Sequence, residues 1–148
     1  MLLLLLLALA ACGTTSDPFL AYREARYADA RPGFERLTRE GHLGAMNALG
    51  VMHLLGLDGP RDLERAHELF RRAALAGHAD AQRNLGLLHE RGLAVPKSML
   101  LAYGWYDLAA RAGHEVARIQ AESLGAQLSA NMARQGREQV EGLMRGGQ

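Results

Sequence analysis

Cysteine, lysine and tryptophan are nearly absent from this chain, which has one of each in 148 residues: Cys12, Lys97 and Trp105. A single cysteine excludes an intramolecular disulfide, so packing alone must stabilise the fold. The net charge is only +1, from 17 basic and 16 acidic residues, and no basic patch stands out. That balance argues against a nucleic-acid partner. Arginine as the dominant cation would suit carboxylate recognition through its planar guanidinium, but a genomic codon bias is the explanation we favour.

The chain begins with an uninterrupted apolar run, Met1–Ala11. At about 1.5 Å per residue, a helix of this length extends about 16 Å, roughly half of a bilayer core, so it is too short to span a membrane. The run has the length of the hydrophobic region of a secretory signal. We therefore interpret residues 1–11 as a signal peptide, with an uncleaved hydrophobic stub as the alternative.

The end of this run, Leu-Ala-Ala-Cys at residues 9–12, resembles the bacterial lipoprotein signal. The resemblance implies cleavage before Cys12, lipidation of its thiol and a short tether over residues 12–17. Gly13 stands where an aspartate would retain such a lipoprotein at the inner membrane, so the resemblance implies the outer membrane, facing the periplasm. The run departs from the pattern because no lysine or arginine precedes it. Cleaved secretion without a lipid is a further alternative.

A tandem repeat of 36 residues occupies the middle of the chain, where residues 41–76 align with 77–112 without a gap. Thirteen of the aligned positions are identical, among them the glycine–histidine pair that opens each copy. The repeat pattern continues weakly from residue 113. A period of this length is typical of solenoids, in which each repeat buries its apolar face against its neighbours.

Each full repeat predicts a pair of amphipathic helices. The first helices are expected at about 43–55 and 79–91, because apolar residues recur at helical spacing and a glycine follows. The second helices are expected to run from the cap Asp62 to residue 76, and over about 97–112.

The flanking segments also predict helices. Residues 18–40 form a partial leading repeat, which begins with proline at its first helical position and contains Pro32-Gly33. Because proline lacks an N–H, we expect a kink there, or two short helices that meet. Residues 113–148 are expected to form a degenerate repeat and a C-terminal capping helix that begins after Ser129.

The repeats resemble Sel1-like repeats, which are related to tetratricopeptide repeats. The second copy carries the resemblance most clearly: Gly92-x2-Val95, then Ala102-x2-Trp105-Tyr106-x2-Ala109-Ala110, then Gly113. The resemblance implies an all-α fold, a short right-handed α-solenoid of stacked helix hairpins. It implies binding of a partner protein rather than catalysis. The chain departs from the family where His53 and His89 replace tyrosine, and where the Leu-Gly pair is missing after Ala117.

The histidines follow the repeat, which removes most of the case for a metal or acid–base site. His42, His78 and His114 share one repeat position, and His53 and His89 share another. Stacked helices lie about 8–10 Å apart, whereas zinc requires ligand atoms at about 2 Å. We interpret these histidines as helix caps or core-filling residues. No nucleophile–base order, glycine-rich phosphate loop or paired carboxylate is present, so we expect no enzyme activity, cofactor or metal.

Surface recognition is the remaining function. In Sel1-like repeats the first helix of each hairpin lines the concave face, so the outward positions of those helices are the candidate partner-binding residues. They are Asn47, Val51, Arg83, Leu87, Glu90 and Arg91. Arg83, Leu87 and Arg91 share one helical stripe, which could hold an extended peptide or a carboxylate. We expect a monomeric adaptor for another envelope protein; a self-associating structural subunit and a histidine-based binding or hydrolytic domain are the alternatives.

Overall fold

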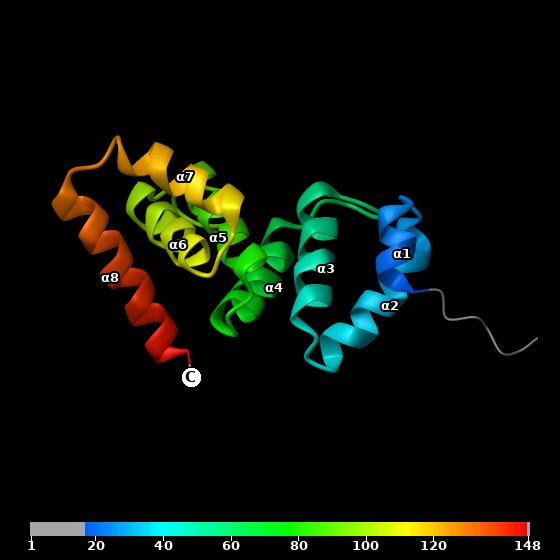
Figure 1. Ribbon diagram of the computed structural model, residues 1–148. Helices are drawn as coiled ribbons and strands as arrows, with labels where there is room; N and C mark the ends of the chain where they lie inside the picture. Colours follow the sequence, from blue (N-terminus) through cyan, green and yellow to red (C-terminus); the bar gives the residue numbers. More distant parts are fainter. Residues whose placement is uncertain (1–16, 148) are drawn as a thin grey trace, which may run out of the picture.

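The computed structural model describes residues 17–147, which form eight α-helices and no strand. The helices are α1 (Pro18–Arg23), α2 (Tyr27–Arg39), α3 (Leu43–Leu55), α4 (Leu63–Leu75), α5 (Ala79–Arg91), α6 (Met99–Arg111), α7 (Glu115–Gly125) and α8 (Ala130–Gly146). Figure 1 shows the helix pairs stacked in chain order, from α1 and α2 at one end to α8 at the other. The predicted all-α solenoid of helix hairpins is therefore confirmed. Among these helices, none has the length and hydropathy needed to cross a membrane.

Side-chain caps fix where the helices begin. A histidine precedes α3, α5 and α7, and its Nδ1 accepts a hydrogen bond from the backbone N–H three residues later. These bonds measure 3.1 Å for His42, 3.4 Å for His78 and 3.2 Å for His114. Each satisfies one of the N–H groups that a helix leaves unpaired at its start. The predicted capping role of these histidines is confirmed, and Asp62, Ser98 and Ser129 cap the second helices in the same way.

Glycines set the spacing within the hairpins. The ring of Phe70 in α4 lies directly on Gly50 in α3, so that a Cβ there would lie 2.6 Å from a ring carbon. In the next hairpin Tyr106 lies on Gly86 in the same manner, at 2.5 Å. The two glycines are equivalent in the repeat, and so are the two rings. The repeat therefore encodes an aromatic side chain on one helix and a matching gap on the other.

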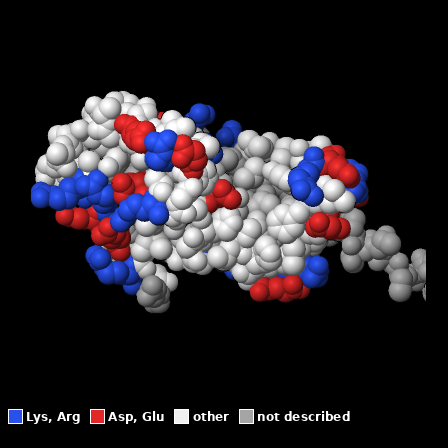
Figure 2. All heavy atoms as spheres, viewed as in Figure 1, with Lys and Arg blue, Asp and Glu red and all other residues white. Residues whose placement is uncertain are grey.

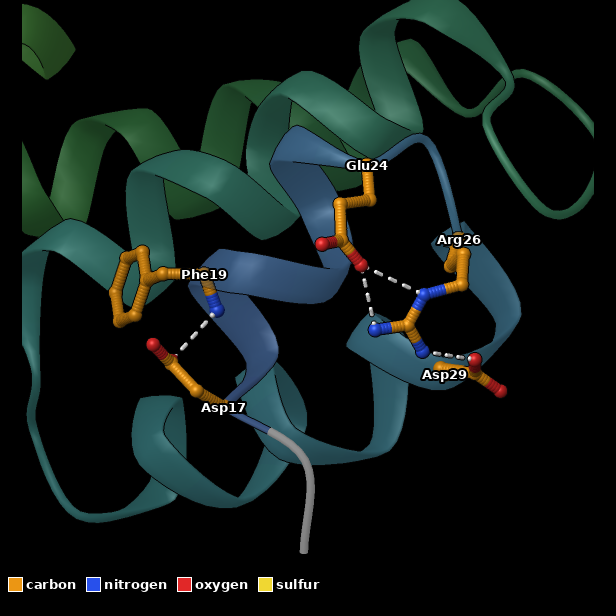
Figure 3. A network of polar contacts seen from close by, with 5 residues as sticks. All are labelled: Asp17, Phe19, Glu24, Arg26 and Asp29. Atoms are coloured by element: carbon orange, nitrogen blue, oxygen red, sulfur yellow. Dashed lines mark hydrogen bonds and ion pairs between the residues drawn. The ribbon is translucent and has the colours of Figure 1, made fainter.

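The junction between the first two helices differs from our expectation. Helix α2 continues through Pro32, and the chain turns instead at residues 24–26, where Ala25 adopts a φ of +57°. Figure 3 shows how Arg26 stabilises this turn: it donates to Glu24 at 2.8 and 3.0 Å and to Asp29 at 2.6 Å. The expected junction of two short helices at Pro32 is therefore wrong, because the two helices meet at residues 24–26 instead.

Two features explain why α2 tolerates its proline. Pro32 leaves the carbonyl of Ala28 without its helical donor, but Ala28 is exposed, so water can reach that carbonyl. Next to it, Gly33 provides room for Pro18 of α1, which would lie 2.7 Å from a Cβ at that position. Packing against α1 thus keeps α2 as one helix across the Pro32-Gly33 pair.

The C-terminal part forms a third unit of two helices, α7 and α8, and both pack on α6. The backbones of α6 and α8 touch at two glycines: a Cβ on Gly104 would collide with the carbonyl oxygen of Gly136, and one on Gly136 with that of Leu100. Val140 is buried one turn further along α8. In Figure 1, α8 is the end helix of the stack, which is the place expected of a capping helix.

Candidate partner-binding face

A row of hydrogen-bonded side chains joins the first helices of the three hairpins. Asn84 Nδ2 donates to Asn47 Oδ1 at 2.9 Å, which joins α5 to α3. Arg83 Nε donates to Gln120 Oε1 at 2.9 Å, which joins α5 to α7. Arg83 Nη1 also donates to Asn84 Oδ1 at 3.2 Å and connects the two bonds. We call Asn47, Arg83, Asn84 and Gln120 the polar row.

The polar row follows the repeat. Both long-range bonds link residues 37 positions apart, one more than the period of 36. Asn47 and Arg83 occupy one repeat position, while Asn84 and Gln120 occupy the next. The residue equivalent to Arg83 in the third unit is Ile119, which is 54% exposed. On α7, the repeat position of Arg83 is therefore occupied by an exposed apolar side chain.

Arg83 determines the orientation of all three amides in the row. A guanidinium only donates, so the atoms that face it on Asn84 and Gln120 must be oxygens. Asn84 then turns its NH₂ group toward Asn47, which must accept through its own oxygen. All three amide oxygens are used within the row. Donors remain: Asn47 Nδ2, Gln120 Nε2 and Arg83 Nη2 make no hydrogen bond to any of residues 17–147.

The surface beside the polar row is hollowed. A depression of about 390 Å³ is lined by residues of α3, α5 and α7 and by the cap of α7. These residues are Asn47, Asp80, Arg83, Asn84, His114 and Val116. His114 Nδ1 accepts from the start of α7, so its proton lies on Nε2, which is 2.9 Å from Asp80 Oδ1. The wall of the depression is thus held by a bond between two successive hairpins.

Charge is sparse on this face. Helix α3 contains no aspartate, glutamate, lysine or arginine. In Figure 2 charged side chains gather over the two ends of the molecule, and the surface over α3 is almost free of them. Within residues 17–147, neither Arg83 nor Arg91 has an ion-pair partner. The face is therefore mainly uncharged, with two unpaired guanidinium groups on α5.

Some of the predicted partner-binding residues lie together on this face, whereas one of them, Glu90, is hydrogen-bonded within the hairpin. Glu90 accepts a hydrogen bond of 2.6 Å from the hydroxyl of Tyr106, so its carboxylate has an internal role. Burial and this bond raise the pKa of Tyr106, whereas the charges of Arg83 and Arg91 lower it. Both arginines therefore lie close enough to influence the same phenol.

The other predicted residues are divided between surface and core. Asn47 is part of the polar row, and Arg91 is exposed at the end of α5. Val51 and Leu87 are half-buried against the hydrophobic core, so only part of each side chain is available to a partner. The predicted lipidation site, Cys12, lies outside the described residues.

Sequence reasoning missed the contribution of α7. The sequence predicts only a degenerate repeat and a capping helix over residues 113–148. In the structure, α7 extends the row with Gln120 and presents exposed Val116 and Ile119. The signal was present: the glycine–histidine pair recurs at residues 113–114, so the repeat register continues and assigns position 120 to the same face as Asn84.

The histidines are spread over several surfaces. Among residues 17–147, no group of three or more histidine, cysteine, aspartate or glutamate side chains is placed to hold a metal ion. His53 and His89 are partly buried near the ends of α3 and α5, and burial lowers the pKa of each. They occupy core-edge positions, one in each repeat.

Comparison with known proteins agrees with the geometry. The protein-family model of the Sel1 repeat matches residues 44–78 and 79–114 of this chain. A crystal structure of a Sel1 repeat protein from Oxalobacter formigenes is 29% identical, with a TM-score of 0.70 over 74% of this chain and 45% of that chain. A protective antigen of uropathogenic Escherichia coli strains, which displays an SLR fold, is 21% identical, with a TM-score of 0.78 over 88% of this chain and 29% of that chain.

No curated protein matches the chain. The chain spans less than half the length of both solved structures, so their similarity concerns the repeats rather than the whole of those proteins. Sel1 repeats typically serve as scaffolds for protein–protein interactions. The chain therefore contains two Sel1 repeats, residues 44–78 and 79–114, which form the middle of its solenoid.

Proposed function

We propose that this protein is a non-catalytic adaptor in the bacterial cell envelope, which binds another envelope protein through the face formed by α3, α5 and α7. The observation that carries the proposal is the polar row, which repeats with the solenoid and borders a depression. A periodic surface of this kind suits an extended segment that runs across successive hairpins. We call the face formed by α3, α5 and α7 the inner face.

The chemistry of the polar row indicates what the partner presents. Each amide oxygen of the row already accepts a hydrogen bond, whereas N–H donors of Asn47, Arg83 and Gln120 make none, so these donors are the main groups available to a partner. Such donors favour a segment rich in acceptors, namely backbone carbonyls or a carboxylate. The partly exposed Val51 and Leu87 and the exposed Ile119 would contact apolar side chains of the same segment.

An in-cell cross-linking and pull-down experiment tests this proposal. Arg83→Glu replaces the donor that orients the row by an acceptor, so the row loses its order and a carboxylate-bearing partner is repelled. Arg72→Glu makes the same charge change at an exposed position on α4 and is the matched control. We expect one dominant envelope partner that the Arg83 variant loses and the Arg72 variant keeps. A partner retained by both variants would contradict the assignment of the inner face.

The location is a separate part of the proposal, and it rests on the signal-like residues 1–11 and on Cys12. A Cys12→Ser variant should fail to incorporate a labelled fatty acid and should leave the outer-membrane fraction. Equal labelling of the variant and the parent protein would contradict lipidation at Cys12. Where the anchor is used, a partner on the same membrane gains effective concentration, so a small groove can suffice.

A second candidate function is a self-associating structural subunit. It is favoured by two large apolar side chains of α7, Val116 and Ile119, which are 50% and 54% exposed. Light scattering on the full-length chain separates the two functions, because self-association raises the mass with concentration. Replacement of Ile119 by aspartate should then restore a constant monomer mass.

A further inference from the structure

A second hollow lies away from the inner face, between α4, α5, α6 and α8, and it is partly open to solvent. Its volume is about 270 Å³, and its apolar walls are four leucines, one from each helix: Leu75, Leu85, Leu101 and Leu143. His89 of α5 and Trp105 of α6 also line the hollow. None of these residues belongs to the polar row, so this hollow is a separate feature, which we call the leucine cavity.

Two polar atoms on the lining residues have no partner. Trp105 is 2% exposed, and its indole Nε1 makes no hydrogen bond to residues 17–147. His89 Nδ1 is also buried and makes none to the same residues. A buried polar group left unpaired costs about 1–3 kcal/mol, so native structures seldom keep two at one place. Both groups lie on residues that line the leucine cavity, which indicates that something in the cavity pairs with them.

The protonation of His89 determines what each orphan atom requires. In a neutral imidazole one ring nitrogen donates and the other accepts, so the unpaired Nδ1 needs a partner in either tautomer. Burial lowers the pKa of this histidine, which keeps the ring neutral. Nδ1 therefore needs a partner that can donate or accept, whereas the indole N–H of Trp105 needs an acceptor.

The pair of orphan atoms exists only in the second repeat of this chain. The residue equivalent to Trp105 in the first repeat is Leu69, which carries no polar group, although His53 stands where His89 stands in the second. The indole therefore adds a donor that the repeat itself does not require. Basic side chains occur at the outer part of the lining, where exposed Arg71 and half-buried His67 project from α4.

We infer that the leucine cavity binds a small, uncharged, mostly apolar molecule that carries one hydroxyl group. A hydroxyl both accepts and donates, so one such group can pair with the indole N–H of Trp105 and with His89 Nδ1. The leucine walls accept the apolar body of the molecule. An apolar cavity of about 150 Å³ is known to hold benzene, so this larger one has room for a ring of that size. An ionised group would be disfavoured between the leucines.

Phenol and toluene test the inference, because they have the same shape and differ only in a hydroxyl and a methyl group. The chain has one tryptophan, so its indole N–H gives a single NMR cross-peak that reports directly on Trp105. Titration of the full-length chain in lipid nanodiscs, with free ligand measured from its own resonances, should move this peak saturably with phenol. Because a neutral hydrogen bond contributes about 0.5–1.5 kcal/mol, phenol should bind about two- to tenfold more tightly than toluene.

Variants at the two equivalent histidines supply the matched control. His89→Phe keeps a ring of similar shape without Nδ1, so the preference for phenol over toluene should shrink while toluene still binds. His53→Phe makes the same change at the first-repeat position, which does not line the leucine cavity, and should leave the preference intact. If His89→Phe fails to fold, the phenol-to-toluene ratio in the parent protein decides the question alone.

Three results would overturn the inference. An indole peak that moves with neither probe would show that only water occupies the cavity. Equal affinity for phenol and toluene would remove the role of the hydroxyl group. Tighter binding of benzoate than of phenol would show that a charged ligand is preferred and would shift the assignment to the arginine Arg71 at the outer part of the lining.

Discussion

Replacement of Gly136 by alanine should loosen α8 from α6, although alanine is the better helix former. The buried Gly136 lies where the two helices touch, and a Cβ there would collide with the carbonyl oxygen of Leu100. A carbonyl inside a helix cannot rotate away as the end of a side chain can. The substitution therefore forces the backbones apart and opens the contact around Val140, the buried apolar residue next to this crossing.

The size of the effect follows from two opposing contributions. Gly→Ala in a helix interior lowers the free energy of the folded state by about 0.5–1 kcal/mol. Overpacking costs about 1–3 kcal/mol, and the upper value applies because the obstacle is backbone. The net loss in the free energy of unfolding should be about 2 kcal/mol. Gly142, on the same helix, has no atom within 4 Å of an added Cβ, so Gly142→Ala should instead gain about 0.5–1 kcal/mol.

Urea denaturation followed by far-UV circular dichroism measures both variants against the parent protein. The two substitutions are chemically identical and lie on one helix, so their difference of about 3 kcal/mol isolates the contact with α6. A Gly136→Ala variant as stable as Gly142→Ala would refute the close crossing of α6 and α8.

Other predictions concern the caps, the polar row and pH. His78→Ala should lower the free energy of unfolding by about 1 kcal/mol in urea titrations, whereas His78→Asp, which can still cap α5, should not. A double-mutant cycle of Asn47→Ala and Asn84→Ala should give a coupling energy of about 0.5–1.5 kcal/mol; complete additivity would contradict their bond. Burial lowers the pKa of His89, so the unfolded chain binds the proton first. The free energy of unfolding should therefore be highest above about pH 6.5 and should decline as the pH falls through the lower folded-state pKa. The decline should be less steep in His89→Phe. Urea midpoints measured at several pH values test both expectations.

Much of the fold could be predicted from the sequence, because local signals agree with the packing. The first helices of the two full repeats span the predicted residues, Leu43–Leu55 and Ala79–Arg91, since a histidine cap opens each and a left-handed glycine closes it. Pro32 misled the prediction because its effect depends on surroundings: an exposed carbonyl and the contact of Gly33 with α1 keep the helix intact.

The candidate site was less predictable, because side-chain pairing depends on geometry between hairpins. Helical spacing identified Arg83 and Glu90 as outward residues, but it could not show that Tyr106 engages the carboxylate of Glu90. The bond between Arg83 and Gln120 spans 37 residues, and only the stacking of α5 beside α7 brings the two side chains together. The leucine cavity likewise combines four helices and has no signature in any one of them.

The central claim is that the inner face binds a protein partner, and site-specific photo-cross-linking in cells tests it most directly. A photoreactive residue would replace Leu87 or Ile119 on the inner face, or Arg72 on α4, in the full-length protein. The account predicts one cross-linked partner from both inner-face positions and none from position 72. The same partner captured from position 72, with nothing captured from positions 87 and 119, would contradict it.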